Sequence, residues 1–208
     1  MTVHGPSILH LLLVRLKPGL SKEAPRALLA EAAALAGIDG VHHAGAVEAS
    51  RGDSTHSLAL FVFLRDRAAL EEFGAHPAHV RFLRRTLAPS LESMASADVW
   101  VDQPPPEDYA AACCFCVAFE PQVYDWQVRA HLEQVRSSLG RAGLLCAGPS
   151  LDDRQAFRSA GVAFWPGPEA MSAADPLSGP AGPATQARAV VAGPARRLAS
   201  PCAQERLR

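Results

Sequence analysis

The sequence predicts an α+β fold that consists of one complete unit of about 100 residues and a truncated second copy. Residues 14–19 recur as residues 117–122 at a spacing of 103 residues. Residues 40–45 recur as residues 143–148 at the same spacing, which indicates a duplicated domain. Each copy alternates strand patterns with amphipathic helix patterns, and the alternation stops after residue 171.

The composition is that of an ordinary protein with enough apolar residues for two small cores. The chain has 208 residues, 49% of them hydrophobic, and a net charge of −1, so nucleic acid or an anionic membrane is not expected as the main partner. Three of the five cysteines fall in residues 113–116, where strand neighbours point apart and do not bridge easily. We interpret them as core residues, which predicts a reducing, cytoplasmic setting.

The first unit opens with a strand over residues 8–16. Apolar side chains occupy both of its alternating faces, as is typical of a strand that is covered on both sides. After a turn at residues 17–19, apolar residues at helical spacing predict a helix over residues 21–37. Two alternating segments, residues 41–48 and 56–64, then predict two strands separated by a polar loop.

The unit continues with two helices and a closing strand. Asp66 is expected to cap a helix that turns Phe73 inward, and Pro77 is expected to break that helix. Apolar residues on one face predict a further helix over residues 79–91. Residues 97–101 read as the last strand.

Four strands with helices on one face leave the other face apolar and uncovered. A monomer does not tolerate such a face in water, and a second sheet of the same kind would cover it and form a barrel. We therefore expect a homodimer through the open face of the domain at residues 8–101. The alternative is a pseudo-dimer, in which the second copy of the same chain covers this face.

A proline-rich linker over residues 102–109 leads to the second copy at residues 110–171. Residues 112–119 correspond to the first strand, and a helix pattern begins at Asp125. Residues 157–165 correspond to the third strand at a spacing of 101, which implies a preceding loop two residues shorter than in the first copy.

Residues 172–208 contain no aromatic residue and are dominated by Gly, Pro, Ala, Ser and Arg, so they read as a disordered tail. Nothing in this pattern replaces the closing strand. The second copy is then either a degenerate cap on the first or the product of an altered reading frame, because a half-unit without its fourth strand would expose a sheet edge.

Residues 10–19, residues 66–73 and above all Ala75-His76-Pro77-Ala78-His79-Val80, followed by a last strand that bears an aspartate, resemble the stress-responsive dimeric α/β-barrel family, known as Dabb. The resemblance covers residues 8–101 and, more weakly, residues 111–171. The tandem layout is similar to that of two-domain plant members. The resemblance implies a ferredoxin-like α+β unit that pairs into a barrel, a homodimer, and a role in stress or defence.

The resemblance also implies a candidate catalytic residue. In the polyketide-cyclase members of the family, a histidine that matches His79 acts with a tyrosine one turn earlier, and that position is Phe73 here. Without the phenol, cyclase chemistry lacks its hydrogen-bonding partner. The favoured interpretation is structural: His76 and His79 flank the bend at Pro77 and bond to backbone groups that the proline frees.

The candidate cavity and ligand-binding residues are His10, Leu12, Val14, Phe73, His76 and His79. No metal site is predicted, because the neighbours His42 and His43 point to opposite sides of a strand and no carboxylate completes a set. Mg²⁺ is possible from the family resemblance alone, through main-chain oxygens after the first helix. The corresponding connection, residues 37–40, is several residues shorter here, so we carry no ligand over.

We predict a stress-response barrel protein that acts by dimerisation and by binding a small apolar or aromatic ligand, without catalysis and without a required cofactor. Nucleic-acid and membrane partners are not expected. The alternative function is that of an enzyme of the polyketide-cyclase or small-monooxygenase kind, which would use the barrel cavity and His79.

Overall fold

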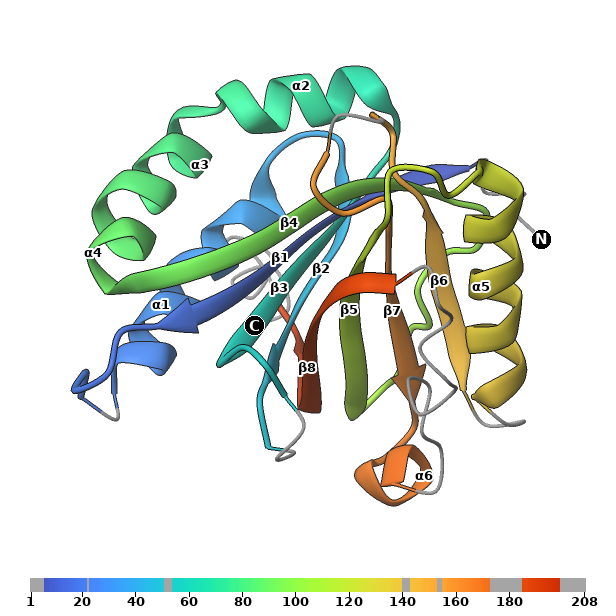
Figure 1. Ribbon diagram of the computed structural model, residues 1–208. Coiled ribbons are helices and arrows are strands. Elements are labelled where there is room, and N and C mark those ends of the chain that lie inside the picture. The colour runs from blue at the N-terminus through green and yellow to red at the C-terminus, as the bar shows by residue number, and fades with distance from the viewer. Residues whose placement is uncertain are drawn as a thin grey trace.

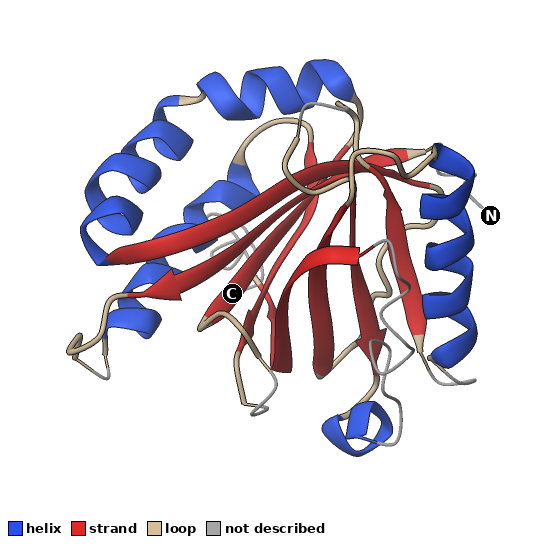
Figure 2. Cartoon of the chain, in the orientation of Figure 1, coloured by secondary structure: helices blue, strands red, loops and turns tan. Residues whose placement is uncertain are grey.

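In the computed structural model, two antiparallel half-sheets of four strands each curve around one interior, and the helices lie outside them (Figure 1). Figure 2 shows this separation of an inner strand layer from outer helices. The structure describes residues 6–21, 23–50, 54–139, 143–152, 155–172 and 185–198. The α+β barrel expected from the sequence is confirmed.

The first half-sheet contains β1 (Ser7–Leu16), β2 (Val41–Glu48), β3 (Leu58–Leu64) and β4 (Leu91–Val101). Strand β1 lies between β3 and β4, and both of its faces are buried. Leu9, Leu11 and Leu13 face the barrel interior, whereas the alternate side chains face the helices, which explains the doubly apolar pattern. Strand β4 begins earlier than the predicted residue 97, because its pairing with β1 continues as far as Leu91.

The helices of the first unit are α1 (Ala24–Ala32), the 3₁₀ segment η1 (Ala33–Gly37), α2 (Arg67–Ala75), α3 (Pro77–Arg81), the π-helical segment η2 (Phe82–Leu87) and α4 (Ala88–Ser90). The Asp66 carboxylate accepts a hydrogen bond from the Ala69 N–H at 2.8 Å and caps α2 as predicted. Pro77 starts α3 and separates it from α2, because proline is favoured at a first helical turn and not in a helix interior.

The second unit repeats this plan with fewer helices. Its elements are β5 (Ala111–Phe119), α5 (Asp125–Ser138), β6 (Leu144–Pro149), β7 (Ser159–Trp165), α6 (Pro168–Ser172) and β8 (Thr185–Arg197). Helix α5 begins at Asp125, directly after the N-cap residue Tyr124, and buries Val128, Leu132 and Val135 against a core that includes Phe115 and Trp165.

Strand β8 corrects the prediction that residues 172–208 form a disordered tail without a closing strand. Residues 185–197 pair along most of β5 and then with β2. Strand β8 is therefore the edge strand of the second half-sheet and joins it to β2 of the first (Figure 1). Val191 is fully buried in the barrel interior. Small residues such as Ala189 and Ala192 are sufficient here, because hydrogen bonds on both sides and two packed faces stabilise the strand. Residues 173–184 and 199–208 lie outside the described residues.

The strand register confirms that the two units are repeats and corrects one detail. The spacing of 103 holds between β1 and β5, and the spacing of 101 holds between β3 and β7, which places Phe63 and Phe164 at equivalent positions. Pairing with these strands makes Gly45 of β2 equivalent to Cys146 of β6, not to Gly148. The difference of two residues therefore falls before β6, and the loop between β6 and β7 is as long as its counterpart.

The two half-sheets close on each other at two seams. At one seam β2 pairs with β8 over three residue pairs. At the other, β4 and β6 meet through a single bridge between Val99 and Ser150. The strand order β4-β1-β3-β2-β8-β5-β7-β6 is thus one four-strand order repeated.

Side chains from both units fill the interior of the barrel. The aromatic rings of Phe61 and Phe164 meet edge to face with their centroids 5.5 Å apart, and Phe63 contacts both. The open face of the first unit is therefore covered within the chain. Of the two arrangements that the sequence left open for this face, the structure has the pseudo-dimer, in which the second copy of the same chain covers it.

Candidate functional site

His10 and Asp98 form a hydrogen-bonded pair on the outer face of the first half-sheet. They are direct cross-strand neighbours in β1 and β4, and the His10 Nδ1–H donates to Asp98 Oδ1 at 2.6 Å. The two side chains are 22% and 24% exposed, so the pair is sheltered but open to solvent on one side. When the imidazole is neutral, this bond places the hydrogen on Nδ1 and leaves the His10 Nε2 atom as an acceptor, which the carboxylate strengthens.

His79 and Phe73 lie beside this pair in the helix layer. The ring centroid of His79 is 4.5 Å from that of Phe73 and 6.1 Å from that of His10. The His79 Nδ1–H donates to the Gly74 carbonyl at 3.2 Å, which again makes Nε2 the acceptor. Burial lowers the pKa of His79, so its imidazole is neutral near neutral pH.

The structure brings together four side chains that we name the His10 site: His10, Phe73, His79 and Asp98. Leu12 and Val14 lie on the same face of β1 and belong to the apolar core under the helices. His76 has a different place: it is exposed, and its Nδ1 accepts a hydrogen bond from the Ala78 N–H at 3.2 Å. The backbone bonds expected of a histidine pair around Pro77 are thus confirmed.

The location of the site corrects one premise of the enzymatic alternative. His79 and His10 lie outside the sheet, between β1 and the helices, and not in the barrel cavity that the alternative requires. Residues of β1 alternate between the two faces, so His10 points away from the interior that Leu9 and Leu11 occupy.

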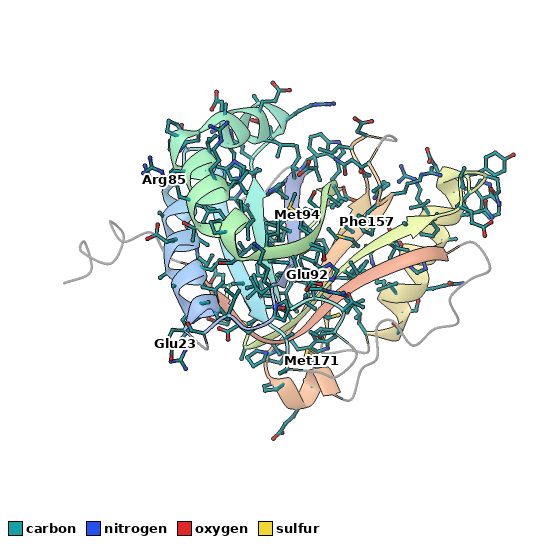
Figure 3. The ribbon with its side chains drawn as sticks, turned by 60° about the vertical axis from the view of Figure 1, so that its left-hand side comes forward. Glu23, Arg85, Glu92, Met94, Phe157 and Met171 are labelled. Carbon is teal, nitrogen blue, oxygen red and sulfur yellow. The ribbon has the colours of Figure 1, made fainter. Side chains whose placement is uncertain are left out.

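The sequence did not reveal that the second unit contributes to this site. Gln155, in the segment between β6 and β7, donates from Nε2 to Asp98 Oδ2 at 3.3 Å and accepts from the Asp98 N–H at 3.2 Å. Leu151 N–H donates to the Asp98 carbonyl at 2.8 Å. Phe157 of the same segment packs against the interior cluster, and Figure 3 labels it near Met94 of β4, where the two units meet.

A second polar pair that the sequence did not predict lies inside the barrel. His43 Nε2 and the Tyr109 hydroxyl are 2.9 Å apart, and the His43 ring stacks on Phe61. Burial lowers the pKa of His43 to about 4, with smaller effects from the positive charges of Arg197 and His42. Burial also raises the pKa of Tyr109, so this pair is uncharged over the physiological range.

The described residues contain no group of three or more His, Cys, Asp or Glu side chains that could hold a metal ion. In the turn after the first helix, the Ile38 and Gly40 carbonyls accept hydrogen bonds from Val41 N–H and Arg65 N–H. The four cysteines in the described part of the chain are buried, and none of them is in a disulfide. Within the described ranges, no helix has the length and apolar character needed to span a membrane.

Residues 8–101 match the model of the stress responsive A/B barrel domain, known as Dabb. The fold of that unit is ferredoxin-like. No curated protein matches the chain.

Solved structures resemble either one unit or both. A Dabb family protein with a ferredoxin-like fold from Mesorhizobium loti is 24% identical, with a TM-score of 0.41, over 49% of this chain and 98% of that chain. A monooxygenase-like protein from Lactobacillus acidophilus is 12% identical, with a TM-score of 0.56, over 93% of this chain and 94% of that chain. A mutant chlorite dismutase from Candidatus Nitrospira defluvii is 12% identical, with a TM-score of 0.52, over 92% of each chain. The last two show that the fold of both units together is one that single chains adopt.

Proposed function

We propose that this protein is a single-chain stress-response barrel that binds a small aromatic molecule with a hydrogen-bond donor, such as a phenol, at the His10 site without converting it. The observation that carries the proposal is the bond between His10 Nδ1 and Asp98 Oδ1, which in the neutral imidazole leaves Nε2 as a strengthened acceptor. The buried rings of Phe73 and His79 pack beside the His10 ring. Binding is favoured over catalysis because the described site residues include no phenol to act with His79.

The proposal includes a biological setting. We place the protein in the cytoplasm, which four buried cysteines outside disulfides support. A role in plant-like stress or defence responses comes from the family and is part of the proposal. Homodimerisation of whole chains, if it adds to the internal pairing, would use an outer surface, and light scattering would report twice the chain mass of 22.0 kDa.

Titration with p-cresol tests the binding site. We expect a saturable shift of the His10 ring nitrogens in ¹⁵N NMR, and binding about tenfold weaker or more after Asp98→Ala, because the strengthened acceptor is lost. Asp102→Ala, which removes an exposed carboxylate just beyond β4, is the matched control and should bind like the wild type. An unmoved His10 resonance, or full binding by Asp98→Ala, would refute the proposal.

The second candidate function is proton transfer on an aromatic substrate, at this outer site instead of the barrel cavity. It is favoured by one observation, the adjacent imidazole rings of His10 and His79. The Asp98 carboxylate bonds to Nδ1 of His10, and the Gly74 carbonyl bonds to Nδ1 of His79.

His79→Gln separates the two functions. Loss of the Gly74 bond and of the contact with Phe73 should lower the free energy of unfolding in urea by about 1–2 kcal/mol. If the wild type instead turned over an aromatic polyketide precursor and His79→Gln abolished turnover with an unchanged unfolding midpoint, the enzymatic function would replace the proposed one.

A further inference from the structure

We propose that the second unit completes the site of the first, with Gln155 as a positioning residue that holds Asp98 against His10. The inference rests on the proposed function, because it identifies what keeps the ligand-binding pair in place. A domain with apolar residues at its own equivalent positions would then still be needed for the site of its neighbour.

The contacts form a continuous chain from one unit to the other. The Ser150 hydroxyl donates to Gln155 Oε1 at 2.5 Å, so the amide is oriented from its own segment. The oriented Gln155 contacts both the backbone and the carboxylate of Asp98, and the other carboxylate oxygen accepts from His10. One carboxylate oxygen of Asp98 therefore bonds to His10 of the first unit, and the other bonds to Gln155 of the second unit.

The repeat offers an internal comparison for these contacts. At the register positions equivalent to His10 and Asp98, the second unit has Cys113 and Ala192, which belong to its apolar helix-side core. The first unit thus has the polar pair at these positions, and the second unit has two apolar side chains there.

The loop contacts are also repeated, with one difference. Ser50 N–H donates to the Ala192 carbonyl as Leu151 N–H does to that of Asp98. The Ser54 hydroxyl accepts from the Ala192 N–H at 3.1 Å, in the position that Gln155 Oε1 has at the Asp98 N–H. Both loops therefore hold the backbone of a closing strand, but Gln155 also reaches a functional side chain. The Gln155 side chain is longer than that of Ser54, so it reaches the Asp98 carboxylate as well as the backbone of the strand.

This arrangement has a specific consequence for His10. The amide of Gln155 bonds to Oδ2 and so restricts rotation of the Asp98 carboxylate. The other oxygen, Oδ1, then stays bonded to the His10 Nδ1–H, and the His10 Nε2 atom keeps its orientation toward a ligand. Without the amide, Asp98 can rotate toward solvent, because it is partly exposed.

The test compares Gln155→Met, which keeps the side-chain length without its hydrogen bonds, with Ser54→Ala as the matched control at the equivalent position. The readouts are the exchange rate of the His10 Nδ1–H proton in ¹H NMR and the affinity for p-cresol. We expect Gln155→Met to accelerate exchange and weaken p-cresol binding by about three- to tenfold each, the factor that one hydrogen bond contributes. Ser54→Ala should leave both unchanged.

Gln155→Asn, whose amide is too short to reach Asp98, should behave like Gln155→Met and serves if that variant does not fold. Unchanged proton exchange in both Gln155 variants would overturn the inference, and so would an equal effect of Ser54→Ala, which would indicate general loosening of the barrel. If the wild type does not bind p-cresol, the proposed function fails, while proton exchange still decides the role of Gln155.

Discussion

Val191→Asp should destabilise the whole barrel by at least about 4 kcal/mol, because it places a carboxylate in a fully buried hydrophobic cluster. Val191 is fully buried in the interior cluster, on the strand that joins the two half-sheets. We expect a large fall in the midpoint of thermal unfolding, or loss of cooperative unfolding, measured by circular dichroism.

Pro194→Asp is the control for Val191→Asp, because it adds the same charge to an exposed position of the same strand. Its effect should stay within about 1 kcal/mol. If Val191→Asp unfolds like the wild type, residues 185–197 do not form a buried strand, and the tail predicted from composition would be the better description.

Acid should destabilise the protein through His43. Its pKa is lowered to about 4 in the folded chain, below the ordinary value of 6.5, so the unfolded chain takes up a proton first as the pH falls. Stability from this group is complete above pH 6.5 and is lost toward pH 4, by about 3 kcal/mol in total. Urea unfolding at several pH values in this window measures the slope.

The repeat suggests the variant that removes this dependence. Leu144 occupies the equivalent position in the second unit, so His43→Leu should be accommodated and should flatten the stability curve between pH 6.5 and pH 4. The bond to Tyr109 is lost at every pH, at a cost of about 1 kcal/mol. A His43→Leu protein with the same pH slope as the wild type would show that other groups cause the acid effect.

The parts of the fold that depend on local pattern could be predicted. The doubly apolar β1 indicates burial on both faces, and Asp66 and Pro77 mark helix boundaries through capping and the missing proline N–H. The repeat spacing gave the correct equivalence of Phe63 and Phe164, because both lie in buried strands whose apolar pattern is strong.

The parts that depend on long-range pairing could not be predicted in the same way. Strand β8 is rich in small residues and contains Pro194, so its stability comes from neighbours on both sides and not from its own propensity. Gln155 reaches Asp98 only because the barrel brings two segments 57 positions apart together. Aligning the loop between β2 and β3 with the loop between β6 and β7, at a spacing of 101, places Gln155 opposite Ser54. This alignment is the sequence signal that could have indicated that Gln155 bonds to a closing strand.

The central claim is that one chain closes its own barrel, and an isotope-filtered nuclear Overhauser experiment tests it most directly. A mixed sample of labelled and unlabelled protein separates contacts within a chain from contacts between chains. The account predicts that the contact between Ala46 and Arg196, across the pairing of β2 with β8, is present and arises within one chain. Its appearance between chains, or its absence from both spectra, would contradict the account.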